Sequence, residues 1–184
     1  MLPSLIDLNL YLWLEYPDMT LFIQEAAIKS KIRGIVRKNV QQHESTLAYF
    51  WLRPDLLNPG QCERDKEVVA FGLDMSGIEK GTINSLLAHN ESLAAADAAF
   101  HCHLTYCGAQ RTKLSVTNKA KDLYFKGKKQ EALKLVRDIG YKGTDRDFFW
   151  LMDDIMQIGK EFRGSLDKAV DEIYDFQCEA HKKN

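Results

Sequence analysis

Residues 118–139, NKAKDLYFKGKKQEALKLVRDI, have the pattern of two short helices joined by a sharp turn. Gly127 interrupts the helical pattern near its centre, and Gly140 follows the second helix, expected at residues 131–139. Glycine adopts the left-handed backbone conformation that such turns need at little cost. The stretch therefore predicts an antiparallel helix hairpin.

A second stretch repeats this pattern with an offset of 37 residues. In each copy a glycine is followed by an alanine and then by two larger apolar residues at the same spacings: Gly127, Ala132, Val136 and Ile139 in the first, and Gly164, Ala169, Ile173 and Phe176 in the second. Thr144 can cap an aromatic-rich helix before Gly164-Ser165, and residues 166–181 would return beside it. The C-terminal third thus predicts two helix hairpins.

The first of these hairpins, AKDLYFKGKKQEALKLVRDI, resembles a tetratricopeptide repeat. The positions that match the small, aromatic and turn positions of the family are Ala120, Leu123, Tyr124, Gly127 and Ala132. The resemblance covers residues 118–177 and implies stacked antiparallel helix pairs that bind peptides or partner proteins in a concave groove. The offset of 37 residues is longer than the ~34 of this family, and a plain antiparallel helix bundle would produce the same pattern.

The remainder of the chain also favours helices. Only 4 prolines and 11 glycines interrupt 184 residues, of which 45% are hydrophobic. After Met19, apolar residues recur at a spacing of three and four: Ile28, Ile32, Ile35, Val36, Val40 and Leu47. Ser76 can open a helix to about residue 89, and Asn90 can cap another that ends at Gly108. The predicted fold is mostly α, an irregular helical bundle or a short stack of helix hairpins.

Two segments are candidates for a minor β element. Residues 6–14 alternate apolar side chains as a half-buried strand does, but the segment is leucine-rich and opens with a capping pattern at Ser4 and Asp7. We favour a helix there. Residues 67–75 are the other strand candidate, because they contain the β-branched pair Val68 and Val69.

Residues 54–64, PDLLNPGQCER, are the best candidate for an internal boundary, because they hold two of the four prolines and a Pro59-Gly60 turn signal. The length suits a single domain of residues 1–184. A subdivision would separate N-terminal helices at residues 1–58 from a helical-hairpin region at residues 64–184.

The two predicted hairpins carry opposite charge. Residues 111–142 contain ten Lys or Arg and three acidic residues, whereas residues 144–180 contain ten acidic and four basic residues. We favour the interpretation that the hairpins bind each other, through exposed ion pairs that contribute ~0–1 kcal/mol each. The alternative is a split surface that recruits a charged partner.

The aromatic run at residues 148–150 predicts a contact surface. Three consecutive residues of a helix face different directions, so they cannot all enter one core. At least one is expected at a helix–helix contact or on the surface, where large aromatic residues often mark interfaces. We expect a non-catalytic adaptor, inhibitor or immunity-type protein that binds another protein, or itself, through its C-terminal hairpins. The predicted interaction residues are Phe148, Phe149, Trp150, Lys126, Lys128 and Lys129.

A nucleic-acid-associated regulator is the first alternative function. Its predicted contacts lie in two basic patches, 29–38 and 111–142: Lys29, Lys31, Arg33, Arg37 and Lys38 in the first, and Arg111 and Lys113 at the start of the second. The formal net charge of −1 weighs against this function, as does the lack of a recognition-helix motif or an aromatic RNA-binding platform. Nucleic acid is therefore the less favoured partner.

The second alternative is a metal-binding protein or enzyme centred on His103 and Cys107. Four residues apart on a helix, these side chains share one face. Two ligands are too few for structural zinc, so we favour ordinary packing and expect no cofactor. No nucleophile motif or phosphate-binding loop occurs, which disfavours an enzymatic activity.

The four cysteines form no CxxC pair, which is typical of a reducing compartment. The apolar N-terminal stretch has no basic region before it, and Asp7 and Glu15 interrupt it. It is expected to be neither a secretory signal nor a membrane span. We therefore expect a cytoplasmic protein without a membrane partner.

Overall fold

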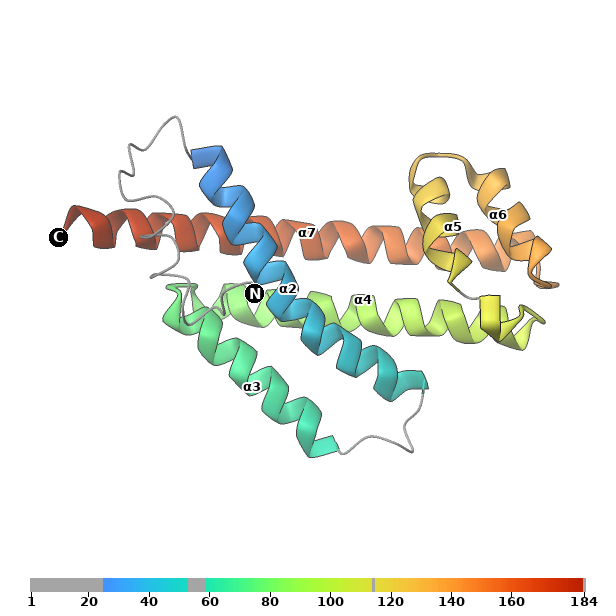
Figure 1. Ribbon diagram of the computed structural model, residues 1–184, viewed down its shortest axis with the longest axis horizontal. Coiled ribbons are helices and arrows are strands. Elements are labelled where there is room, and N and C mark those ends of the chain that lie inside the picture. The colour runs from blue at the N-terminus through green and yellow to red at the C-terminus, as the bar shows by residue number, and fades with distance from the viewer. Residues whose placement is uncertain (1–24, 53–58, 114, 184) are drawn as a thin grey trace. The chain divides into compact units, whose positions relative to one another are not determined.

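The computed structural model describes residues 25–52, 59–113 and 115–183, with the side chains of residues 25–40, 64, 66–113, 115–180 and 182–183. Its elements are α2 (Glu25–Leu52), α3 (Pro59–Met75), α4 (Lys80–Tyr106), the 3-10 turn η2 (Arg111–Lys113), α5 (Val116–Phe125), α6 (Lys129–Asp138) and α7 (Asp145–Lys182) (Figure 1). No strand occurs within these ranges. The prediction of a mostly α fold is confirmed. No described helix is long and apolar enough to cross a membrane.

Residues 67–75 lie in α3, so the prediction of a strand there is wrong. The helix begins at Pro59, within the segment predicted as a loop, because proline is well tolerated in the first helical turn. Gly72 and Leu73 are buried, and α3 packs against α2. This packing of one helical face outweighs the β propensity of two valines. The other strand candidate, residues 6–14, lies outside the described residues.

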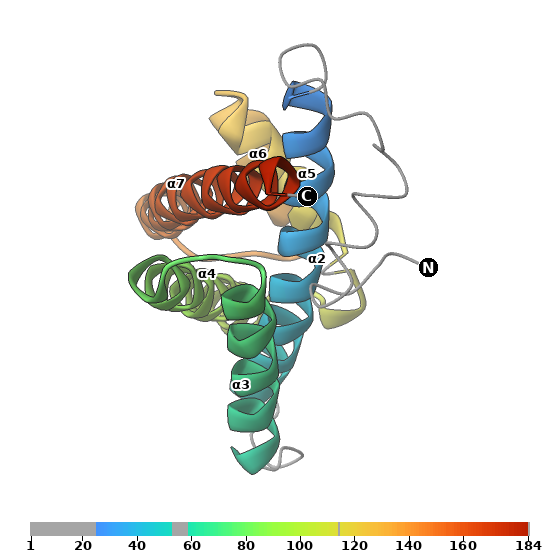
Figure 2. The same ribbon diagram turned by 90° about the vertical axis from the view of Figure 1, so that its left-hand side faces the viewer.

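The chain folds into two compact units, and the division falls inside both α4 and α7. Unit 1 comprises residues 1–91 and 161–184. In it α2 and α3 lie side by side (Figures 1 and 2). The predicted apolar face of α2 is buried throughout its described part: Ile28, Ile32, Ile35, Val36 and Val40.

Acidic side chains of α7 connect α7 to α2 and to the start of α4 in unit 1. Glu172 accepts hydrogen bonds from the backbone N–H of Glu79, at 2.9 Å, and from the Thr82 hydroxyl, at 2.6 Å. A carboxylate therefore lies at the N-terminus of α4, where the helix dipole favours negative charge. Asp171 and Asp167 form ion pairs with α2: Lys29 to Asp171 at 3.0 Å, and Arg33 to Asp167 at 2.5 Å.

Asn90 does not begin a helix, because α4 continues through it without interruption. The side chain is buried, and its amide nitrogen donates a hydrogen bond to the Val40 carbonyl of α2 at 3.4 Å. Asparagine is favoured at helix starts because it can bond free backbone N–H groups. Here its amide bonds a neighbouring helix instead, and the predicted break is wrong.

Unit 2 comprises residues 92–160 and contains the predicted hairpin, formed by α5 and α6 (Figure 1). Its turn and its end carry glycines in the left-handed conformation, with φ of +82° at Gly127 and +106° at Gly140. Thr144 caps α7 as predicted, since its hydroxyl accepts a hydrogen bond from the Asp147 N–H at 3.1 Å. The main buried residues are Phe100, Leu104, Ala120, Tyr124, Ala132, Val136, Tyr141, Phe148 and Met152.

The second predicted hairpin does not form, because α7 continues through Gly164 and Ser165. An interior glycine costs a helix only about 1 kcal/mol relative to alanine. Against this cost, buried residues recur on one helical face across the glycine: Phe162, Leu166, Ala169, Val170 and Ile173. Their burial keeps the segment helical.

Two backbone hydrogen bonds join the end of α4 to the end of α6 in unit 2. Gln110 N–H donates to the Ile139 carbonyl and Lys142 N–H to the Cys107 carbonyl, both at 2.7 Å. Gly108 and Gly140 face each other between these bonds. A Cβ atom at Gly140 would lie 2.6 Å from the Gly108 carbonyl oxygen. Both positive φ and lack of space therefore require glycine here.

We predict that Gly140→Ala destabilises unit 2 by roughly 3 kcal/mol or more. The Gly108 carbonyl oxygen must move away from the added Cβ, and the alanine is also strained by the positive φ. Gly127→Ala is the matched control, since its φ is also positive but nothing lies within 4 Å of the added Cβ. It should cost only about 1–2 kcal/mol. Urea denaturation followed by circular dichroism measures both, and equal losses would contradict the prediction.

Candidate partner-binding site

The three consecutive aromatic residues of α7 have different environments. Phe148 is fully buried, Phe149 is half-buried, and the Trp150 side chain is 67% exposed. Phe148 contacts the rings of Phe100 and Tyr141, at centroid distances of 5.9 and 6.1 Å. The exposed tryptophan is therefore presented by a helix whose opposite side is anchored in the core of unit 2.

Trp150 lies at the edge of a hollow of about 470 Å³ on unit 2. Among the described residues, the others that line it are Thr144, Arg146 and Asp147, from the first turn of α7 or its cap. The hollow thus combines one large aromatic ring with a guanidinium group, a carboxylate and a hydroxyl group. This mixture of an apolar anchor and directional polar groups is typical of recognition sites.

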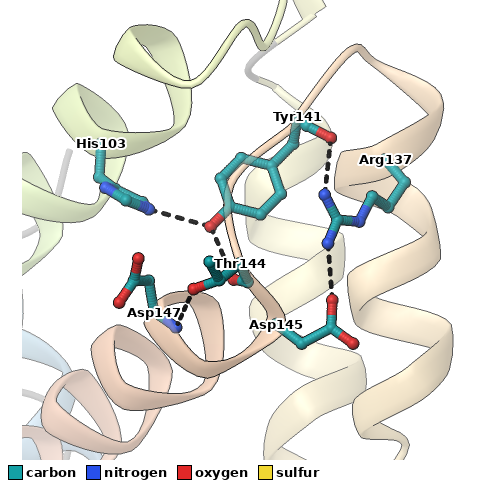
Figure 3. A network of polar contacts seen from close by, with 6 residues as sticks. All are labelled: His103, Arg137, Tyr141, Thr144, Asp145 and Asp147. Carbon is teal, nitrogen blue, oxygen red and sulfur yellow. Dashed lines mark hydrogen bonds and ion pairs between the residues drawn. The ribbon is translucent and has the colours of Figure 1, made fainter.

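A polar network includes Thr144 and Asp147, two of the residues that line the hollow (Figure 3). The Tyr141 hydroxyl donates a hydrogen bond to the Thr144 carbonyl at 3.1 Å and lies 2.9 Å from His103 Nε2. Because the hydroxyl has one proton to donate, Nε2 of His103 must be the donor to it. Burial raises the pKa of Tyr141 to about 12, and its electrostatic interactions with Cys107 and Asp147 add to this shift.

Arg137 attaches α6 to the start of α7 in the same network. Its guanidinium group donates to the Tyr141 carbonyl at 3.1 Å and pairs with Asp145 at 2.6 Å (Figure 3). It also lies 5.1 Å from the centroid of the Tyr141 ring. The N-terminus of α7 is consequently held by Arg137 of α6 and by Tyr141 of the segment between α6 and α7. These contacts limit the motion of the residues that line the hollow.

Of the three lysines predicted as interaction residues, Lys129 contacts α7 near Trp150. Lys129 lies 4.0 Å from Asp153, which is one helical turn from Trp150, and 5.0 Å from the Tyr124 ring. Tyr124 donates a hydrogen bond to the same carboxylate at 2.6 Å, and its pKa is raised by burial and by Asp153. Lys128 pairs with Glu131 at 3.6 Å. Lys126 is exposed and has no ion pair with the described residues.

The two basic patches predicted for nucleic acid lie in different units. Lys29 and Arg33 of unit 1 are engaged by acidic residues of α7, and Lys29 also pairs with Glu25. Hydrogen bonds to Glu25 and Asp171 raise the pKa of Lys29. The rest of that patch lies on exposed positions of the same helix: Lys31, Arg37 and Lys38. In unit 2, Arg111 and Lys113 are exposed in η2.

The predicted pair His103 and Cys107 is brought together on α4 and the turn after it. The sulfur lies 3.9 Å from Nδ1 and 3.8 Å from Nε2 of the imidazole, so neither nitrogen is specifically directed at it. Among the described side chains, no group of three or more His, Cys, Asp or Glu could hold a metal ion. His103 also bonds the hydroxyl of Tyr141 through Nε2, at 2.9 Å.

A partly buried ion pair that the sequence did not suggest joins α4 to α5 in unit 2. Asp97 lies 2.6 Å from Lys121 and 3.5 Å from His101. Burial of the carboxyl group would raise its pKa, but the hydrogen bond from His101 and the charge of Lys121 outweigh this effect and lower the pKa to about 2. The ionised form of Asp97 therefore stabilises the fold.

The hollow itself was only partly foreseeable. The capping role of Thr144 and the surface position of one aromatic residue follow from local sequence, whereas Arg146 and Asp147 carried no distinguishing signal. Comparisons with protein-family models, with curated proteins and with solved structures found no match for this chain.

We predict that Asp97→Asn lowers the unfolding free energy by about 2 kcal/mol at pH 7, as a pKa depressed from about 4 to about 2 implies. Because the folded pKa is the lower one, the contribution is complete above about pH 5 and disappears as the pH falls through about 2. Urea denaturation of both proteins between pH 7 and pH 2 measures the difference.

Asp138→Asn, at an exposed position of α6, is the control and should change stability little at any pH. A pH-independent loss for Asp97→Asn would show that packing, and not the charge, accounts for it.

Proposed function

We propose that this chain is a non-catalytic cytoplasmic protein that binds an acidic partner protein through the Trp150 surface. The Trp150 surface is defined by Thr144, Arg146, Asp147 and Trp150, and in this proposal the exposed lysines at the α5–α6 turn, Lys126, Lys128 and Lys129, extend it. The observation that carries the proposal is the 67% exposure of Trp150 beside a hollow. Adaptor, inhibitor and immunity-type proteins act by binding a partner protein without catalysing a reaction.

The exposed indole supports the proposal on energetic grounds. A tryptophan offers a large apolar area with few rotatable bonds, so ordering it on binding costs little entropy. Residues whose truncation costs 2 kcal/mol or more in interfaces are enriched in Trp, Tyr and Arg. Trp150 and Arg146 line one hollow and belong to this group.

The charge of unit 2 supports an acidic partner. Between residues 92 and 160 there are twelve basic and eight acidic residues, a net charge of +4, while the rest of the chain carries −5. Part of the basic charge is neutralised within unit 2, by Asp97, Asp145 and Asp153. The remainder would accelerate encounter with a negative surface and would make binding depend on salt.

The residues that resemble a tetratricopeptide repeat form one helix pair, α5 and α6. Its apolar residues Ala120, Tyr124 and Ala132 belong to the same buried cluster as α4 and α7 residues. A continuous α7 leaves no second hairpin at residues 144–181. We therefore place the proposed binding at the start of α7 and the α5–α6 turn, and not in a groove between stacked repeats.

Nucleic-acid binding remains the second candidate function, and one observation favours it. Six basic residues of the patch 111–142 are exposed without an ion pair to any described residue: Arg111, Lys113, Lys119, Lys126, Lys134 and Lys142. Phosphates could occupy such positions and would give affinity that falls steeply with ionic strength.

We predict that Trp150→Ala weakens binding to the partner by roughly 30-fold, the equivalent of ~2 kcal/mol, without changing stability, because the side chain is exposed. Affinity capture from native lysate, with and without nuclease, identifies the partner, and titration of the purified pair gives the dissociation constants. Phe71→Ala, an exposed aromatic residue of unit 1, is the matched control and should bind as the unmodified chain does. Equal binding by the Trp150 variant would refute the proposal.

The double variant Lys126→Glu, Lys128→Glu separates the two candidate functions. For an acidic protein partner we predict slower association and a smaller dependence on salt, while Trp150 remains necessary. If captured material disappears after nuclease treatment, and duplex DNA or RNA binds with an affinity that these two substitutions abolish, the nucleic-acid function is the correct one.

A further inference from the structure

Helix α3 of unit 1 carries an exposed apolar stripe. Val68, Phe71 and Met75 are 65%, 57% and 54% exposed. Spacings of three and four residues place them along one side of the helix, whereas Gly72 and Leu73 on another side are buried. Single exposed apolar residues are ordinary, but a continuous line of them usually marks a contact surface.

The stripe continues past the end of α3. Phe176 of α7 is 41% exposed and lies on Gly77, two residues after Met75, where an added Cβ would overlap its ring. All four side chains belong to unit 1. We refer to Val68, Phe71, Met75 and Phe176 as the α3 stripe.

The chain itself contains a segment suited to cover this stripe. Residues 4–16, SLIDLNLYLWLEY, include seven strongly apolar side chains: Leu5, Ile6, Leu8, Leu10, Leu12, Trp13 and Leu14. In a helix, Leu5, Leu8 and Leu12 would share a side with the same spacing as the stripe, and in a strand the even-numbered residues 6–14 would share one face. Either conformation offers a continuous apolar face that water disfavours.

The segment can reach the stripe from its point of attachment. Residues 17–24 connect it to Glu25, the first residue of α2, and eight extended residues span about 26–29 Å. Because α2 and α3 form an antiparallel pair, the start of α2 and the end of α3 lie toward the same end of that pair (Figure 1). A tether of this length gives the segment an effective concentration in the millimolar range.

Size favours this occupant over a second copy of the chain. Four partly exposed side chains fall well short of the ~800 Å² per partner that a standard stable interface buries. A tethered segment needs less area, because it loses much less translational freedom on docking than a free partner does.

We propose that residues 4–16 dock on the α3 stripe of the same chain. This intramolecular contact buries the apolar faces of both segments and leaves the Trp150 surface as the separate place where a partner binds. It does not depend on the proposed function, since it concerns residues of unit 1 alone.

Photo-crosslinking from the stripe tests the proposal in the full chain. p-Benzoylphenylalanine replaces Phe71, a conservative change of an exposed ring, and the purified protein is irradiated at low concentration and mapped by mass spectrometry. A crosslink to residues 4–16 at monomer mass is expected. The same photoreactive residue at Asn84, an exposed position of α4, is the control and should not label this segment. If the Phe71 variant does not fold, position 68 replaces it.

The other outcomes overturn the proposal. A product of dimer mass would assign the stripe to a second copy, and equal labelling from position 84 would show that the segment contacts unit 1 unspecifically. Absence of a crosslink to residues 4–16 from both stripe positions would leave the stripe to a different occupant.

Hydrogen exchange gives an independent measure. Leu8→Asp with Leu12→Asp should speed exchange of the backbone amides of residues 68–75 roughly tenfold, because undocking removes the cover of α3. Asn9→Asp adds a charge to the same segment at a polar position and should leave exchange unchanged. Equal exchange in the unmodified chain and the leucine variant would contradict the docking.

Discussion

The burial of the Phe148 ring is the contact on which unit 2 depends. This one side chain touches Phe100 of α4, Tyr124 of α5 and Tyr141 in the segment between α6 and α7. Its position sets the rotation of α7 about its own axis. Trp150, two residues later, is turned by about 200° and must face outward. The core and the proposed binding surface are therefore set by the same side chain, which is why a rigid helix can present a large exposed ring.

The acidic residues of α7 act on several elements and not on one opposing hairpin. In unit 2, Asp145 pairs with Arg137, and Asp153 accepts a hydrogen bond from Tyr124. In unit 1, Asp167 and Asp171 pair with α2, and Glu172 bonds the start of α4. The favoured interpretation of the charge pattern assumed two hairpins that bind each other. A single long helix distributes these charges along its length, so that ion pairs specify the register of different neighbours.

Local patterns predicted the features of the fold that depend on local physics. Gly127 and Gly140 end helices because both adopt positive φ, and the Thr144 hydroxyl caps α7 through a contact three residues away. The same signals failed at Gly164 and Asn90. Around Gly164 the apolar residues continue on one helical face, so burial outweighs the small cost of an interior glycine. A glycine predicts a turn only when the apolar pattern around it also stops.

By itself, the sequence determined the helical class, the α5–α6 hairpin, the Thr144 cap of α7 and the expectation that the three aromatic residues cannot share one core. All of these follow from interactions between residues a few positions apart. Only the tertiary structure decided that Trp150 is the exposed one, that His103 bonds Tyr141, and that Lys121 pairs with Asp97. These outcomes depend on the rotation and register of helices that are distant in sequence. Many weak contacts between distant residues set the rotation and register of each helix, so they cannot be predicted from a local sequence pattern.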